Sequence, residues 1–160
     1  GTGFFSNGKP KILFERHVMR RRLLVHKLDP TPYYTVAPDL VNIKSGGYVG
    51  GIKEFDRLER AMQIDPTSAL ESCSWGAYQI MGYHYKWLGY PSVEAMVNDA
   101  YESEAKHLNM FVKFIKADPR LHAAIKAEDW TTFARIYNGP GNVKVYSAKL
   151  KKAAERAFIM

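Results

Sequence analysis

The chain has 160 residues, and its apolar fraction of 46% and aromatic fraction of 13% exclude a disordered protein. Its formal net charge of +7 favours an anionic partner, such as nucleic acid, acidic lipid or an anionic glycan, without choosing among them. The single Cys73 excludes an internal disulfide, and no apolar run predicts a membrane span or a signal peptide, so we expect one soluble domain over residues 1–160.

The first third of the chain alternates turn-forming and basic segments. Residues 1–10 predict a loop or short hairpin, because glycines and an Asn-Gly pair recur there. Residues 12–24 predict a short strand or helix start that passes into a basic helix. Three prolines between 30 and 38 mark an irregular segment, and "SGGYVGG" at 45–51 predicts a flexible connector.

The rest of the chain shows apolar residues at helical spacing. Pro66 marks a turn and the capped start of a new helix, and Ser92 caps a longer amphipathic segment. We predict helices from 53 to that turn and over 69–81, 92–115, 121–127, 130–137 and 146–160. The expected fold class is mainly α, a helical domain with at most a small β hairpin near the N-terminus.

The stretch "SCSWGAYQIMGYH", residues 72–84, is the most unusual of the predicted helices. Gly76 would cost about 1 kcal/mol relative to Ala in a helix interior, which suggests that something approaches the backbone closely. The Trp75 ring could stack on a sugar and the Gln79 amide could bond its hydroxyls, so this segment could form the wall of a sugar groove. The alternative is a buried helix in which Gly76 permits close helix packing.

A second stretch, "RIYNGPG" at 135–141, places Tyr137 and Asn138 before a stiff Gly-Pro corner. Such a corner holds side chains in predictable directions, which suits a binding site. The alternative is that Asn138 only caps the turn and Tyr137 belongs to the core.

Together these stretches resemble the G-x-x-Q-I and Y-N-x-G elements of the lysozyme and lytic transglycosylase superfamily. Longer strings are similar to recurring segments of one family, the phage-endolysin N-acetylmuramidases. They are "GTGFFSNGKPKILFERH", "GGYVGG", "RLERA", "CSWGAYQIMG", "DWTTFARIYNGP" and "YSAKL". The resemblance covers nearly the whole chain in order and implies a lysozyme-like fold for a single catalytic domain.

The family's catalytic Glu lies in an E-S-x-G-x-G-F stretch at the end of the first helix, and this sequence opens on the tail of that stretch, Gly1 to Phe4. We expect a natural N-terminal segment to supply the Glu and its helix. The alternative is a protein that has lost its general acid and is not a working glycosidase.

Glu15 matches the second carboxylate of the family, in its F-E-R-H stretch. Glycoside hydrolysis commonly needs one protonated and one ionised carboxyl group. Neighbouring Arg16 and His17 could keep Glu15 ionised, which suits the second role. The alternative is a structural ion pair between Glu15 and Arg16 or a basic residue of the following helix.

By the same resemblance, Gln79 and Tyr137 would lie close together in space and face one groove with Glu15. Further groove or supporting residues would be Ser74, Trp75 and Asn138, and His17 would position water or orient Glu15. Glu71 is expected to be an ordinary helix carboxylate, and Glu104 a surface or supporting acid. Ser147 departs from the family, which has Asp there, so any role of that carboxylate is in doubt.

The implied activity is cleavage of the β-1,4 bond between N-acetylmuramic acid and N-acetylglucosamine in peptidoglycan. A lytic transglycosylase acting on the same bond is the close alternative. A non-catalytic cationic module that uses Arg20–Arg22 on the cell envelope is the distant one. No H-E-x-x-H or C-x-x-C spacing occurs, so we expect no metal and no cofactor. We also expect no nucleic acid partner, a monomer, and a protein made in the host cytoplasm that acts on the cell wall in the periplasm.

The last predicted helix is basic and amphipathic. Its cations could contact the anionic surface of the outer membrane, to which each contributes about 1 kcal/mol near the lipid. The alternative is a helix that packs its apolar stripe on the core and leaves its charges in water. The cations concerned are Lys149, Lys151, Lys152 and Arg156.

Overall fold

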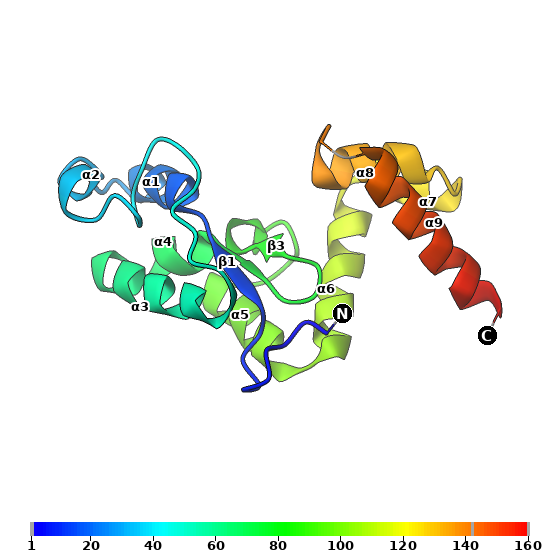
Figure 1. Cartoon of the computed structure of the whole chain (residues 1–160), viewed down its shortest axis with the longest axis horizontal. Coiled ribbons are helices and arrows are strands. Elements are labelled where there is room, and N and C mark those ends of the chain that lie inside the picture. The colour runs from blue at the N-terminus through cyan, green and yellow to red at the C-terminus, as the bar shows by residue number, and fades with distance from the viewer. Residues whose placement is uncertain (1, 142, 160) are drawn as a thin grey trace. The chain divides into compact units, whose positions relative to one another are not determined.

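The computed structural model describes residues 2–141 and 143–159, without the side chains of 146, 153 and 156–159 (Figure 1). The chain divides into two compact units, Gly1–Phe111 and Val112–Met160, and each is described by itself. Within the described residues, no helix is long and apolar enough to cross a membrane.

Helices dominate both units, which confirms the mainly α fold class. The first unit contains β1 (Ile12–Phe14), α1 (Arg16–Val25), α2 (Tyr33–Val36), η1 (Gly51–Lys53), α3 (Glu54–Ile64), α4 (Pro66–Glu71), β2 (Cys73–Trp75), β3 (Ile80–Met81), η2 (Gly82–His84) and α5 (Val93–Glu102). Helix α6 (Glu104–Ala117) runs across the division, and the second unit continues with α7 (Pro119–Lys126), α8 (Trp130–Asn138) and α9 (Val143–Ile159).

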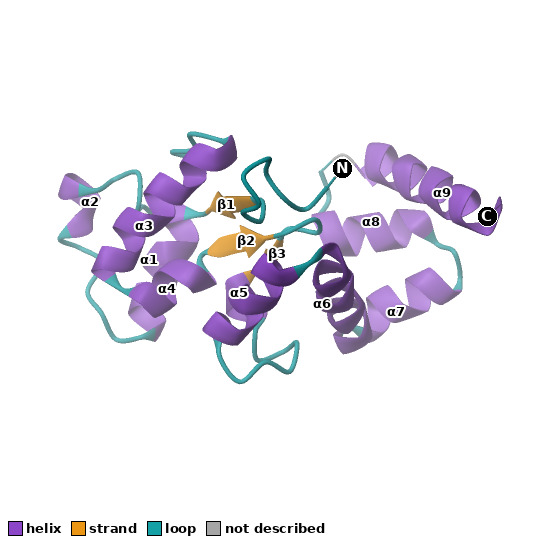
Figure 2. Cartoon of the chain, turned by 90° about the horizontal axis from the view of Figure 1, so that it is seen from below, coloured by secondary structure: helices purple, strands orange, loops and turns teal. Residues whose placement is uncertain are grey.

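The three strands form one antiparallel sheet in the order β1-β2-β3. Its buried face packs against helices, and in Figure 2 the strands lie beside α3, α4 and α5. Phe14 from β1 and Trp75 from β2 are 0% and 1% exposed. Burial raises the pKa of the Cys73 thiol on the same face.

The predicted helix over 69–81 is wrong, because this segment forms the end of α4 and then the β2–β3 hairpin. Asp65 caps α4 by accepting from the N–H of Ser68, and Pro66 occupies the first helical position. Gly76 then adopts φ 75°, a left-handed conformation that favours glycine, and Gln79 adopts φ 51°. A Cβ at Gly76 would also lie 2.9 Å from the His107 ring. The glycine therefore serves a tight turn against a buried histidine, and not a helix–helix contact.

The predicted helix over 92–115 is interrupted at Ser103, which is extended at φ −167° and ψ 163°. The Ser103 hydroxyl accepts from the N–H of Lys106 at 3.2 Å and so starts α6 afresh. The predictions over 121–127, 130–137 and 146–160 correspond to α7, α8 and α9.

Candidate active site

Strand β1 presents alternate side chains to opposite faces of the sheet. Ile12 and Phe14 are buried, whereas Leu13 and Glu15 are part-exposed and belong to the other face, which we call the open face. Leu13 pairs with Ser74 of β2, and Ser74 pairs with Met81 of β3, so these residues form one row across the open face. Glu15 follows β1 directly, with its N–H bonded to the carbonyl of Ser72 at 2.9 Å.

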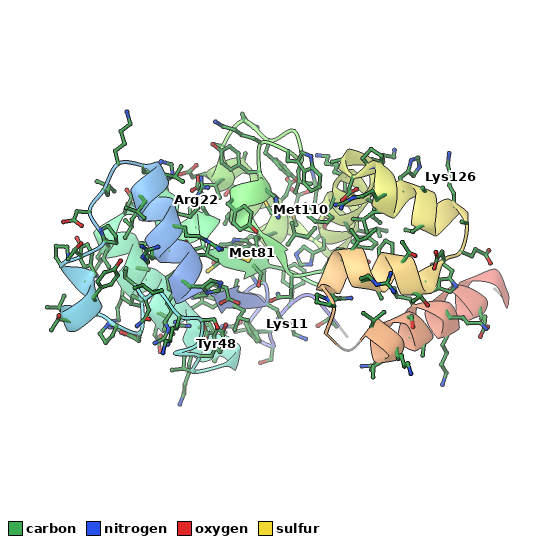
Figure 3. All side chains as sticks on the ribbon, turned by 90° about the horizontal axis from the view of Figure 1, so that it is seen from above. Lys11, Arg22, Tyr48, Met81, Met110 and Lys126 are labelled. Carbon is green, nitrogen blue, oxygen red and sulfur yellow. The ribbon has the colours of Figure 1, made fainter. Side chains whose placement is uncertain are left out.

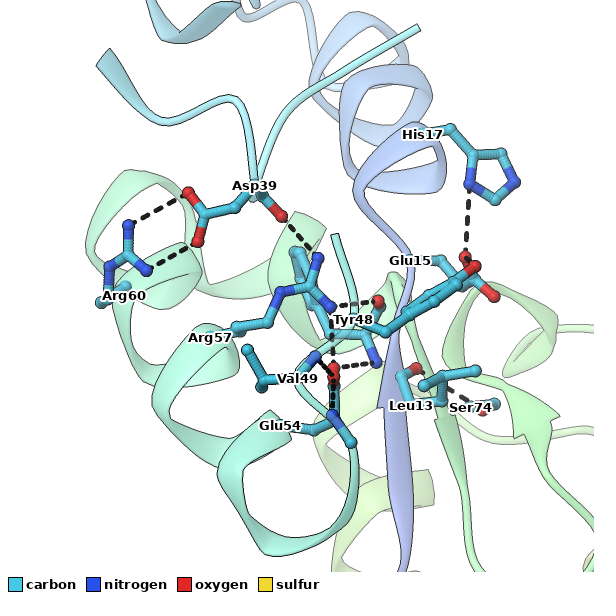
Figure 4. A network of polar contacts seen from close by, with 12 residues as sticks. Leu13, Glu15, His17, Asp39, Tyr48, Val49, Glu54, Arg57, Arg60 and Ser74 are labelled. Atoms are coloured by element: carbon cyan, nitrogen blue, oxygen red, sulfur yellow. Dashed lines mark hydrogen bonds and ion pairs between the residues drawn. The ribbon is translucent and has the colours of Figure 1, made fainter. Parts of the chain in front are cut away.

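The Tyr48 hydroxyl and the His17 ring converge on one oxygen of the Glu15 carboxylate (Figure 4). The Tyr48 hydroxyl donates to Oε2 at 2.7 Å, and Nδ1 of His17 lies 3.3 Å from the same oxygen. The Glu15 side chain is 18% exposed. Among the described residues, Oε1 has no polar partner, so this oxygen is available to water or substrate.

Tyr48 acts as a donor to this carboxylate across the neutral pH range. Its partial burial, together with the hydrogen bond to Glu15 and the charge of Glu15, raises the pKa of Tyr48 to about 12. A phenol with that pKa stays protonated, and its O–H can stabilise an ionised carboxylate by a charge-assisted hydrogen bond.

The expectation that Arg16 contacts Glu15 is wrong. The Arg16 guanidinium instead donates to three backbone carbonyls, those of Pro38, Lys44 and Ser45, at 2.9–3.0 Å. It thereby holds the 38–45 loop against the start of α1. Of the two predicted neighbours of Glu15, only His17 is beside its carboxylate.

A buried ion pair fixes the loop that carries Tyr48. Glu54 and Arg57 are 0% and 2% exposed, and Arg57 Nη1 donates to Glu54 Oε2 at 2.8 Å. Glu54 also accepts from the N–H groups of Phe14, Val49 and Gly50 at 2.8–3.1 Å. Burial alone would raise the pKa of Glu54, but these three N–H groups and the Arg57 charge hold it below its ordinary value.

The same arginine ties together the other segments around Glu15. Arg57 donates to the carbonyl of Phe14 at 2.9 Å and to the carbonyl of Asp39. One side chain therefore connects α3, the strand that leads into Glu15 and the 39–50 segment. Sequence reasoning did not identify Tyr48, Glu54 or Arg57 as site residues. Glu54 and Arg57 are three residues apart at the start of a helix, where a charged pair usually lies in water.

Ser74 and Gln79 lie together beside the open face. The Ser74 hydroxyl donates to the Gln79 amide oxygen at 2.7 Å. The Gln79 amide nitrogen donates to the carbonyls of Lys11 and Gly76 at 3.1 and 2.9 Å. Next to them an open pocket of about 440 Å³ is lined by Thr2, Phe5, Lys11, Ile12, Leu13, Gly51, Gly76, Ala77 and Gln79.

The expectation that the Trp75 ring faces a sugar groove is wrong. Trp75 is 1% exposed, and its indole N–H donates to the Leu70 carbonyl at 3.1 Å. Its position one residue after Ser74 places it on the buried face of the sheet. Because Trp75 is buried, it can only support the open face from beneath.

Tyr137 and Asn138 end α8 in the second unit. The Tyr137 ring stacks on Phe133 and meets Phe114 edge-on, with ring centroids 5.6 Å apart in both pairs. Asn138 is exposed, and Gly139 follows it at φ 78°. The juxtaposition of Tyr137 with Gln79 stays a prediction.

Two other carboxylates have definite structural partners. Glu71 is 0% exposed and receives Arg22 Nε at 2.5 Å and His26 Nε2 at 2.9 Å, so the expectation of an ordinary helix carboxylate is wrong. Glu104 accepts from the N–H of Gly3 at 2.6 Å and is half exposed. It therefore holds the N-terminal segment, as a supporting acid.

Comparison with known proteins gives a consistent result. The family model for N-acetylmuramidase matches residues 1–157. The crystal structure of the Burkholderia AP3 phage endolysin superposes with a TM-score of 0.90 at 45% sequence identity. That match covers 98% of this chain and 58% of the endolysin chain, so this chain spans less than two thirds of its solved relative. No curated protein matches the sequence.

Proposed function

The chain belongs to the N-acetylmuramidase family, and we propose that it is the catalytic part of a phage endolysin that hydrolyses peptidoglycan. The bond cleaved is the β-1,4 bond between N-acetylmuramic acid and N-acetylglucosamine, and the partner is the glycan strand of the bacterial cell wall. The enzyme class is glycoside hydrolase, acting as a monomer.

The observation that carries this proposal is the anchored carboxylate of Glu15 on the open face. Tyr48 and His17 hold one carboxylate oxygen, while the other has no partner among the described residues. An ionised carboxylate held in this way can activate water or stabilise an oxocarbenium-like transition state. The Tyr48 hydroxyl donates to this carboxylate at 2.7 Å and so fixes its orientation on the open face.

We propose that Glu15 acts as the ionised carboxylate of the pair that glycoside hydrolysis commonly needs. In that role Glu15 acts on the anomeric side of the cleaved bond. Thr2 lines the pocket beside Gly76 and Gln79, and Glu104 accepts a hydrogen bond from the N–H of Gly3. Ser74, Gln79, Tyr137 and Asn138 are proposed to contact the glycan, with His17 orienting Glu15.

Analysis of the reaction products tests this proposal directly. Purified peptidoglycan digested by the full-length protein should yield fragments that end in reducing N-acetylmuramic acid, identified by mass spectrometry. Fragments lighter by one water, with an anhydro ring, would instead establish the lytic transglycosylase alternative. Binding of envelope without any soluble fragment would establish the non-catalytic module.

Helix α9 supports a finer proposal about the partner surface. Lys149, Lys151 and Lys152 are exposed on this helix, whereas the side chain of Arg156 lies outside the described residues. We propose that these cations contact the anionic outer-membrane surface.

Replacing Lys149, Lys151, Lys152 and Arg156 by Gln should spare hydrolysis of purified peptidoglycan and weaken killing of intact Gram-negative cells. Equal killing by the variant and its parent at matched concentration would exclude this role.

A further inference from the structure

A second pocket lies along α1, apart from the one beside Gln79. Its volume is about 350 Å³, and it is lined by Val18, Arg21, Arg22, Val25 and Tyr83. The four residues from α1 follow the spacing of one helix face, and Tyr83 closes the pocket from η2. Figure 3 shows the side chains of this part of the chain, with Arg22 labelled on α1.

The three consecutive arginines of α1 have different partners. Arg20 Nε donates to the Tyr34 hydroxyl at 2.7 Å, and Arg22 Nε donates to the buried Glu71 at 2.5 Å. Arg21 is exposed and has no partner among the described residues. Its whole guanidinium is therefore available to a ligand in this pocket, whereas Arg22 offers only the N–H groups other than Nε.

The pocket favours an anion with an apolar portion. Arg22 is held in place through Nε, so its remaining N–H groups keep a fixed direction beside Arg21. Glu71 balances the charge of Arg22, because Arg22 Nε donates to its Oε2 at 2.5 Å, so Arg21 supplies the charge that remains for an anion. Two guanidinium groups with planar N–H donors suit a carboxylate, and Val18 and Val25 suit small apolar groups next to it.

The pocket lies along the helix that begins directly after the proposed catalytic carboxylate. Arg21 follows His17 by four residues, so both side chains lie on the same side of α1. His17 contacts Glu15, and Arg21 lies six positions after Glu15, which corresponds to about 9 Å along the helix axis. A group attached to a sugar bound at Glu15 can span such a distance.

We infer that this pocket binds a free carboxylate of the peptide stem on the muramic acid next to the cleaved bond. This inference rests on the proposed function. The peptide stem carries carboxylates together with the methyl groups of alanine, which matches the guanidinium pair and the two valines. Arg21 is then a specificity residue that recognises stem-bearing glycan.

Two substrates and two variants test this inference in the full-length protein. The substrates are peptidoglycan with intact stems and glycan strands from which an amidase has removed the peptides. Arg21→Gln should lower kcat/KM on stem-bearing peptidoglycan by about tenfold or more, in line with the loss of a charge-assisted hydrogen bond, and leave peptide-free strands unaffected. The matched control is Lys27→Gln, which removes an exposed cation just beyond α1 that does not line the pocket.

The outcomes separate this inference from the function on which it rests. Equal loss by Arg21→Gln on both substrates, or no loss on either, would overturn the stem-binding pocket while leaving the muramidase intact. The same holds if Lys27→Gln reproduces the substrate-selective loss, because net charge alone would then explain it. A parent protein that cleaves neither substrate would overturn the proposed function itself.

Discussion

Glu15→Gln is expected to lower the rate of peptidoglycan hydrolysis by about 10²–10⁴-fold, the range that a general base contributes. The amide keeps the size of the side chain and can still accept a hydrogen bond from Tyr48. It cannot carry the negative charge that activates water or stabilises the transition state. The fold should be retained, because Glu15 is part-exposed and its backbone bond to Ser72 is unaffected.

The rate of release of soluble muropeptides measures this effect, and circular dichroism with a thermal melt confirms the fold. Glu59→Gln is the matched control, since Glu59 is an exposed carboxylate on α3 and should keep parental activity. Parental activity of Glu15→Gln would show that Tyr48 and His17 hold a structural carboxylate and not a catalytic one.

Arg57→Met is expected to destabilise the first unit by about 3–5 kcal/mol, the usual effect of removing one partner of a buried ion pair. The variant would leave the buried Glu54 carboxylate without its counter-charge and the carbonyls of Phe14 and Asp39 without their donor. Denaturant unfolding measures the loss. Proteolysis within residues 39–50 should accelerate as well, because Arg57 ties this segment to β1.

Arg60→Met is the matched control for this effect. Arg60 lies on the same helix and pairs with Asp39, but its side chain is 53% exposed, so its loss should cost no more than about 1 kcal/mol.

Because the pKa of Glu54 is lowered on folding, its stabilising charge is present above an unfolded value of about 4.3 and is lost as pH falls through the lowered value. The difference between Arg57→Met and the parent should therefore shrink in acid. A similar loss for both arginine variants, or a difference that grows in acid, would contradict this account.

Apolar spacing predicts most helices of this chain well, because α3, α7 and α8 each bury one stripe. The break at Ser103 is not visible in that spacing, since α5 and α6 both continue to bury apolar residues such as Met96 and Met110. Strands β2 and β3 contain three and two residues, which is too short for alternation to be recognised. The unusual Gly76 marks the correct place, but its left-handed φ is set by the turn and by His107.

Some residues of the candidate site can be predicted from the sequence, and others cannot. Glu15 and Gln79 are identified through strings that resemble a known family. Tyr48 and Arg57 act through contacts with residues 33 and 43 positions away in sequence, and such contacts have no local pattern. Helix spacing cannot indicate that Trp75 lies on the buried face, because that depends on the strand that replaces the helix.

The alternation along β1 constrains how this gene can change. Inserting or deleting one codon between Lys11 and Glu15 would exchange the two faces, turning Phe14 outward and Glu15 toward the core. Substitutions at Lys11 and Leu13, which line the open pocket, leave that alternation intact. Natural lineages and engineered libraries should thus vary this segment in composition at constant length. Insertions and deletions should instead occur in exposed turns such as that around Gly89, where no neighbouring atom lies within 4 Å of an added Cβ.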